Sequence, residues 1–331
     1  MYSIFQVISV LSPFFHTQSI SSIVFSVTDY TKFAYTLSVQ VLILGARGFI
    51  GGRLVEFLRR ERPLWNVISA PSLDFNPAYL SQYFENLLSK LDSPPDLVIN
   101  CFWIGTSRNA RKSVEIQNNN SLFLNELIKQ INYHTDNRSR IVLFGSQAEL
   151  SPEETPWSES SPMLPYDAYG FAKKFCFESV LKSGLPFSWI RLFSVYGPND
   201  RRDWIVTKVL NALLKKEPLK LGSCNQIWPL THVDDVCSGI LGVIELKLHG
   251  IINLTNRENV TLRASMEFLQ NLSGQHGIIE FSNDQTLVKN LIVDETLLEI
   301  KGYPAKIPIF AGLASLWEDV SYQNKFDAPV K

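Results

Sequence analysis

A glycine-rich turn between an apolar strand and a helix is the feature that most restricts how this chain can fold. Residues 41–44 (VLIL) are apolar, as in a buried parallel strand. The turn Gly45–Gly51 (GARGFIG) follows directly, and apolar residues then recur at helical spacing as far as Arg60. Because the turn stands between a strand and a helix, it predicts a βα unit that binds phosphates.

The three glycines of this turn have different tasks in such a unit. Gly45 permits the tight turn, Gly48 lets the backbone approach a diphosphate, and Gly51 allows the helix to pack closely on the strand. The free N–H groups and the positive dipole at the start of the helix then favour phosphates. The alternative is a structural turn in another α/β fold. We expect a dinucleotide to contact six residues of the turn, namely Gly45, Arg47, Gly48, Phe49, Ile50 and Gly51.

Strands and helices alternate along the rest of the chain. Apolar segments predict four further strands, over residues 66–70, 96–102, 140–144 and 187–192. Helical spacing predicts helices over residues 121–131 and 175–181. This alternation indicates an α/β fold with a doubly wound parallel sheet, that is, a Rossmann fold. We expect the nucleotide-binding domain to comprise residues 40–196 and 236–256, and a smaller, discontinuous substrate-binding lobe to comprise residues 197–235 and 257–331.

Composition excludes several classes of function. With 331 residues, 45% of them hydrophobic, the chain can bury a large core. Its 31 basic and 32 acidic residues give a net charge of −1, which predicts binding to neither nucleic acid nor an anionic membrane. No apolar run reaches about 18 residues, so we expect no membrane-spanning helix.

The cysteines and the first residues bear on the compartment. Cys101, Cys176, Cys224 and Cys237 lie far apart, without a CxxC pair or the spacing of a metal site, which favours reduced thiols in a cytoplasmic protein. Residues 1–39 are rich in Ser, Phe, Ile and Val and lack the clear pattern of a signal peptide. We expect an unstructured extension there, with an added strand or an unusual targeting segment as alternatives.

The segment Tyr169-Gly170-Phe171-Ala172-Lys173 carries the chemistry. Residues four apart share one face of a helix, so the phenol and the ammonium point the same way. The ammonium can stabilise the phenolate and also bond a ribose, which lets the tyrosine exchange a proton with an alcohol oxygen. Ser146 follows the predicted strand at residues 140–144, where it can bond the same reacting oxygen. By itself, a serine in such a loop is more often turn chemistry.

Together these motifs resemble the extended short-chain dehydrogenase/reductases, in the NAD-dependent epimerase/dehydratase branch that acts on nucleotide sugars. The resemblance covers residues 40–256 and includes three further segments, Asn119–Leu127, Ile190–Pro198 and Thr231–Val236. It implies a homodimer built from the helix of the Tyr169 motif and its neighbour. It also implies site roles for six residues: Ser146, Tyr169 and Lys173 as the catalytic triad, Asn119 in support of the active-site helix and the proton path, and Phe193 and Ser194 beside the nicotinamide.

The region after the second strand favours NADP(H) as the cofactor. Residues 67–72 (VISAPS) contain no carboxylate to bond the adenosine ribose or to repel a 2′-phosphate. Arg47 can offer a bidentate guanidinium to that phosphate, although it can also simply solvate the loop. Asp74 is a candidate for bonding the adenine, with an ordinary strand-end aspartate as the alternative. NAD(H) therefore stays possible.

The residues around Ser146 narrow the reaction. Sugar dehydratases of the branch carry Thr-Asp-Glu where this chain has Ser146, Gln147 and Ala148, which cannot eliminate water. Glu149 is one residue too far along and should point elsewhere. Reductases of the branch that also epimerise C3 and C5 carry a cysteine in place of Gln147, so we do not expect that activity in this chain.

Three functions then remain. The resemblance favours NADP(H)-dependent reduction of a 4-keto nucleotide sugar, with Gln147, Gln226 and Trp228 as substrate contacts, although Gln226 and Trp228 can equally be packing residues. A 4-epimerase with tightly bound NAD is the first alternative. An NADP-binding sensor is the second, although such proteins typically lack the Tyr or the Lys. Trp103, where the branch has small residues, should narrow the site.

Overall fold

The computed structural model describes residues 39–136, 138–152, 155–283 and 289–326, and the extension predicted for residues 1–39 lies, apart from Val39, outside them. Six strands form one parallel sheet in the order β2-β1-β3-β4-β5-β9. Their bounds are Asn66–Ser69 for β2, Gln40–Leu44 for β1, Leu97–Asn100 for β3, Arg140–Ser146 for β4, Phe187–Leu192 for β5 and Gly250–Leu254 for β9. The predicted parallel α/β sheet is confirmed.

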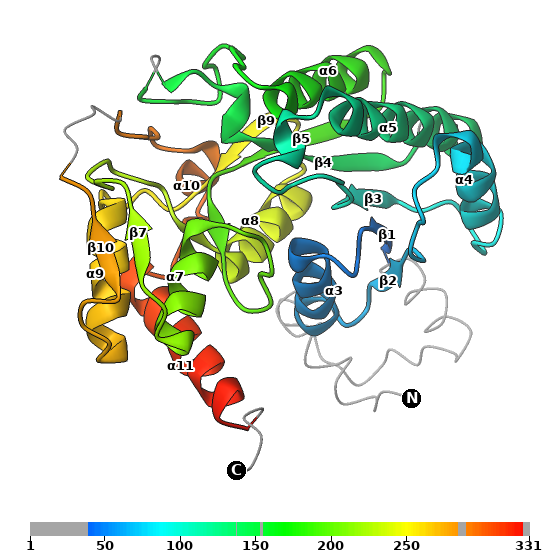
Figure 1. Cartoon of the computed structure of the whole chain (residues 1–331). Coiled ribbons are helices and arrows are strands. Elements are labelled where there is room, and N and C mark those ends of the chain that lie inside the picture. Colours follow the sequence, from blue (N-terminus) through cyan, green and yellow to red (C-terminus); the bar gives the residue numbers. More distant parts are fainter. Residues whose placement is uncertain (1–38, 137, 153–154, 284–288, 327–331) are drawn as a thin grey trace, which may run out of the picture. The chain divides into compact units, whose positions relative to one another are not determined.

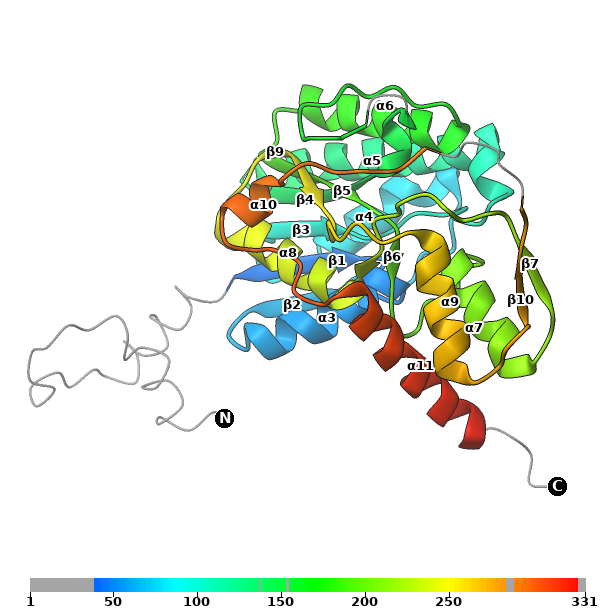
Figure 2. The same cartoon turned by 90° about the vertical axis from the view of Figure 1, so that its left-hand side faces the viewer.

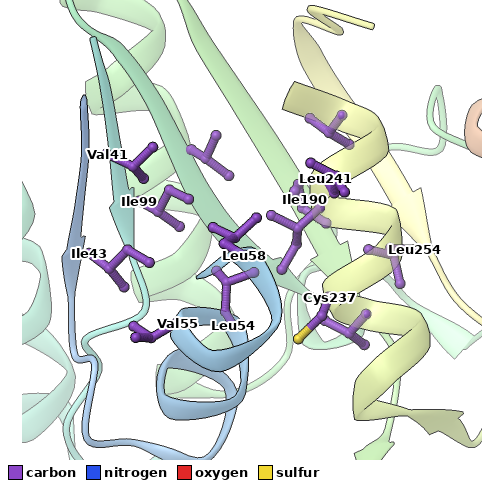
Figure 3. Packing of buried hydrophobic residues seen from close by; sticks show 14 of the residues in the cluster. Val41, Ile43, Leu54, Val55, Leu58, Ile99, Ile190, Cys237, Leu241 and Leu254 are labelled. Atoms are coloured by element: carbon purple, nitrogen blue, oxygen red, sulfur yellow. The ribbon is translucent and has the colours of Figure 1, made fainter. Parts of the chain in front are cut away.

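Helices cover both faces of this sheet (Figure 1). One face carries α4 (Leu80–Leu88), α5 (Val114–Thr135) and α6 (Ala168–Lys182), and the other carries α3 (Phe49–Glu61) and α8 (Val233–Glu245). Figure 3 shows the interface between the sheet and helices α3 and α8, where Ile43 and Ile99 from the strands face Leu54 and Leu58 of α3. Apolar side chains thus fill both sides of the sheet, as the uninterrupted apolar strands require.

A second group of elements follows β5 and lies beside the sheet (Figure 2). Helices α7 (Ile205–Lys215), α9 (Leu262–Ser273) and α11 (Ile309–Phe326) share an apolar cluster. Two small parallel sheets belong to this region, one pairing β7 (Leu219–Leu221) with β10 (Ile279–Phe281) and the other pairing β6 (Val195–Tyr196) with β8 (Thr231–His232). Helix α10 (Leu297–Ile300), predicted for the smaller lobe, instead contributes Leu298 to the core around α3 and α8.

A membrane-spanning helix has to be both long and apolar. In the part of the chain that is described, no helix is both long and apolar enough to cross a membrane.

Candidate active site

A cleft of about 650 Å³ opens at the carboxyl ends of the strands, and the three predicted catalytic residues line it. Ser146 is the last residue of β4, Tyr169 lies in the first turn of α6, and Lys173 follows one turn later. The carboxyl edge of an open α/β sheet is where ligands bind in this class of fold. The structure therefore brings the three side chains into one cavity.

Gly170 explains how α6 comes so close to the serine loop. A Cβ at this position would lie 2.2 Å from the carbonyl oxygen of Ala148, so any side chain would push the helix away. Asp167 caps the helix by accepting a hydrogen bond from the Gly170 N–H at 2.7 Å. Together they hold Tyr169 beside the loop that carries Ser146.

Lys173 is almost fully buried at the floor of the cleft. Its Nζ donates to the carbonyl oxygen of Phe144 at 2.7 Å and lies 3.4 Å from the ring centroid of Trp103. The Trp103 ring also meets Tyr169 edge-on at 5.6 Å, and its Nε1 donates to Gln117 at 3.0 Å. Trp103 thus occupies space beside both predicted catalytic side chains, in line with the predicted narrowing of the site.

A buried ion pair lies behind Ser146. The Glu149 and Arg191 side chains are both fully buried and are joined by a 3.3 Å contact between Glu149 Oε2 and Arg191 Nε. Glu149 Oε1 accepts a hydrogen bond from the Ser146 N–H at 2.7 Å. Burial raises the pKa of the Glu149 carboxyl, while Arg191 acts in the opposite direction. Glu149 points away from the cleft, as predicted, and holds the backbone of the serine.

Three residues predicted for cofactor or substrate contact form one hydrogen-bonded chain in the cleft. Trp228 Nε1 donates to the Ser194 hydroxyl at 2.6 Å, and that hydroxyl donates to the side-chain oxygen of Gln147 at 3.4 Å. All three residues line the cavity. Ser194 has a positive φ of 37°, a conformation uncommon for a serine, which the surrounding contacts support. These two hydrogen bonds hold the three side chains together in the cleft lining.

Other predicted site residues lie elsewhere. Phe193 is fully buried against Trp157, with ring centroids 5.9 Å apart, and Gln226 is buried outside the cleft lining. Asn119 is half-buried and does not line the cleft, whereas its neighbour Asn120 is buried. Asn120 accepts from the N–H of Ile104 and donates to that residue's carbonyl oxygen, so it anchors the loop after β3. Asn120, and not Asn119, therefore holds this loop, because helix geometry turns Asn120 inward, and the role predicted for Asn119 stays a prediction.

A second cavity of about 320 Å³ lies at the glycine turn. Arg47 and Ser72 both line it, whereas Asp74 is exposed outside its lining. Gly51 is required here, since a Cβ would come within 2.2 Å of the carbonyl oxygen of Gly45. Gly45 itself has a φ of +71°, which favours glycine.

The two cavities adjoin and share four lining residues, Gly48, Cys101, Phe102 and Trp103. One cavity holds a glycine turn at a helix N-terminus, and the other holds the Ser-Tyr-Lys group. A two-part space of this kind suits a dinucleotide, whose phosphates the free N–H groups of the glycine turn would bind. Among the described residues, no group of three or more His, Cys, Asp or Glu side chains is placed to hold a metal ion.

Comparison with known proteins assigns the family. The model of the NAD dependent epimerase/dehydratase family matches residues 41–254, well over half of the chain. The chain belongs to this family. It is an NAD(P)-dependent enzyme of the family. The matched residues extend from β1 to β9, which are the first and last strands of the main sheet along the chain.

Individual relatives of the family are distant. The chain is 24% identical over 276 residues to the uncharacterised UDP-glucose epimerase YtcB of Bacillus subtilis, covering 74% of this chain and 85% of that protein. It is 25% identical over 277 residues to the UDP-glucuronate 4-epimerase of Thermodesulfobacterium geofontis, covering 73% and 83%. Among solved structures, RMD from Pseudomonas aeruginosa complexed with NADPH has a TM-score of 0.75 at 16% identity, covering 86% of this chain and 100% of the other. At this identity the structural likeness establishes the fold.

Proposed function

We propose that this enzyme uses NADPH to reduce the 4-keto group of a nucleotide sugar. The observation that carries the proposal is the union of two features in adjoining cavities. One is the Ser146, Tyr169 and Lys173 group, and the other is a nucleotide pocket in which Arg47 and Ser72 stand without a carboxylate. A guanidinium and a hydroxyl at that place suit the 2′-phosphate that distinguishes NADPH from NADH.

The reaction follows from the roles of the three side chains. Bound NADPH would supply the hydride for the carbonyl carbon. The Ser146 hydroxyl accepts from the Ala148 N–H at 3.2 Å, so its own proton is free to bond the substrate carbonyl oxygen. Tyr169 donates its proton to that oxygen and yields the alcohol. Lys173, 5.6 Å from the centre of the Tyr169 ring, stabilises the phenolate that remains.

Dehydration has no support in this cleft. Gln147 lines the cavity through a neutral amide, and Ala148 is buried and apolar. Glu149, the next carboxylate along the chain, is held by Ser146, Trp189 and Arg191 outside the cleft. Elimination of water needs an acid and a base beside the sugar, and these three positions supply neither.

A 4-epimerase is the second candidate, because the two curated relatives reported above carry epimerase names. The same Ser146, Tyr169 and Lys173 would serve it, with the proton first removed from an alcohol and later returned. The two functions differ in the fate of the cofactor: a reductase consumes NADPH in each turnover, and an epimerase keeps NAD bound.

Comparison of NADPH and NADH binding tests the proposed cofactor preference. A charge-assisted, bidentate contact contributes about 1.5–3 kcal/mol, so Arg47→Ala should weaken NADPH binding about 10- to 100-fold and leave NADH binding unchanged. Arg60→Ala, which removes an exposed cation at the far end of α3, is the matched control. Equal affinity for the two cofactors in the wild type, or NAD retained through purification, would favour the epimerase.

We also propose a homodimer formed by α5 and α6. These helices pack together and present large apolar side chains to solvent, with Leu122 50%, Phe171 57% and Phe175 50% exposed. Both helices lie on the outer side of the molecule in Figure 1. An apolar surface of this kind favours association with an identical surface.

A further inference from the structure

Arg111 stands beside the catalytic tyrosine without any part in the reaction described above. It lies in a short 3-10 helix (Ala110–Lys112) just before α5, and it lines the cleft. Its guanidinium carbon is 4.0 Å from the ring centroid of Tyr169 and 5.3 Å from that of Trp204. The two aromatic rings therefore hold a cation at the place where the substrate must meet the phenol.

The side chain of Arg111 is not neutralised by a neighbour. Within the described residues its guanidinium has ring contacts but neither a hydrogen-bond acceptor nor an ion-pair partner. Arg202, which also lines the cleft, differs in this respect, since its Nε and Nη2 both donate at 2.7 Å to the Asp200 carboxylate. Arg111 thus keeps its N–H donors for a ligand.

The lining of the cleft is positive even though the whole chain is nearly neutral. Its described lining residues include one carboxylate, that of Asp200, and four cationic side chains, those of Arg108, Arg111, Lys173 and Arg202. Lys173 is used by the reaction and Arg202 by Asp200, while Arg108 is exposed at the rim. The remaining charge next to the phenol is that of Arg111, and such a cleft attracts anions.

We propose that Arg111 binds an oxyanion of the substrate, through two parallel N–H donors of its guanidinium. This inference rests on the proposed function and adds to it the group by which the substrate is selected. The oxyanion is either a phosphate of the nucleotide or a carboxylate on the sugar, and the same planar fork suits both. Stacking on Tyr169 and Trp204 fixes the plane of the fork before the substrate arrives, which lowers the cost of ordering it.

Binding measurements on Arg111 variants test the proposal. UDP, dTDP, CDP and GDP are titrated by calorimetry into wild type, Arg111→Gln and Arg111→Lys, each saturated with NADP⁺. We expect Arg111→Gln to weaken binding of the ligands that carry the recognised oxyanion about 10- to 100-fold, and Arg111→Lys to recover part of that affinity because a charge remains without the fork. Lys112→Gln is the matched control, since it removes an equal charge from the adjacent, exposed position outside the cleft lining.

A second pair of ligands separates the two sources of the oxyanion. If Arg111 binds a phosphate, UDP-glucose and UDP-glucuronate lose affinity equally in Arg111→Gln. If it binds a sugar carboxylate, the four diphosphates bind the variant and wild type alike, and the loss is confined to UDP-glucuronate. Unchanged binding of all six ligands in Arg111→Gln overturns the inference and leaves the proposed function standing. Failure of every ligand to bind wild type overturns both, and unchanged affinity for NADPH shows that the variants are folded.

Discussion

Replacing Arg191 by methionine would leave the carboxylate of Glu149 buried without its ionic partner. Both side chains have 0% exposure, and the apolar methionine can fill most of the volume of the arginine stem. Arg191 also donates to the carbonyl oxygens of Ser158, Glu159 and Ser161, but at long distances of 3.4 Å, 3.3 Å and 3.4 Å. The main effect of the substitution is therefore an uncompensated charge in the core directly behind Ser146.

The size of this effect follows from the burial of the pair. Removing one partner of a buried ion pair costs about 3–5 kcal/mol, whereas removing both charges is often nearly neutral. In domains of this size, each kcal/mol lost from the free energy of unfolding lowers Tm by about 2 °C, so Arg191→Met should lower Tm by about 6–10 °C. The double variant Glu149→Gln with Arg191→Met should regain most of that loss.

The pH dependence of Tm tests the role of the ion pair independently. Burial raises the pKa of Glu149 in the folded state, and without Arg191 this effect is no longer opposed. A carboxyl whose folded pKa exceeds its unfolded pKa favours folding at low pH and loses that contribution as pH rises through the folded pKa. The Tm difference between wild type and Arg191→Met should therefore narrow as pH falls from about 8 to about 5.

Differential scanning calorimetry at several pH values measures all of these quantities. Arg60→Met is the control, because the pair Arg60–Glu61 is 62% and 40% exposed. Surface pairs of this kind contribute about 0–1 kcal/mol. If Arg191→Met were no less stable than Arg60→Met, or if the double variant were less stable than the single one, the ion pair would not have the role given to it here.

Two further substitutions test the cleft and the outer helices. Trp103→Ala should tighten NADP⁺ binding about 5- to 30-fold, because it frees the Lys173 ammonium from a cation–π contact of about 1–2 kcal/mol; weaker binding, measured by calorimetry, would mean that the indole supports the cofactor. Phe171→Glu with Phe175→Glu should convert a dimer into a monomer in sedimentation velocity, because four buried carboxylates would meet at the interface. Leu272→Glu, at an exposed position of α9, should not do so.

The local patterns of the sequence predicted the sheet well. Residues 187–192 were predicted as a strand and form β5 with the same bounds, since an uninterrupted apolar run between turns has few other conformations. The helix predicted for residues 121–131 is longer, because Ser113 caps it eight residues earlier by accepting from the Ile116 N–H. Helix α4 was missed, although its buried Leu80, Phe84 and Leu87 follow helical spacing.

The contacts that give the site its character were beyond sequence reasoning. Arg111 and Tyr169 are far apart in the chain. Only the packing of the loop after β3 on α6 places the Arg111 guanidinium over the Tyr169 ring. Glu149 could be excluded from the cleft by its spacing, but its partner Arg191 lies on the next strand of the sheet. Periodicity identifies which face of an element is buried, and it does not identify the partner on another element.

Reaction of the enzyme with NADPH and dTDP-4-dehydro-6-deoxyglucose, a representative 4-keto nucleotide sugar, tests the central claim most directly. We expect wild type to oxidise one NADPH for each alcohol formed, as measured by the loss of NADPH absorbance and by product analysis. We expect Tyr169→Phe to slow this step at least about 100-fold, the contribution typical of a positioned acid, with NADPH affinity unchanged. Turnover of Tyr169→Phe at the wild-type rate would contradict the mechanism. Epimerisation of UDP-glucose by wild type without net consumption of NADPH would contradict the assignment as a reductase.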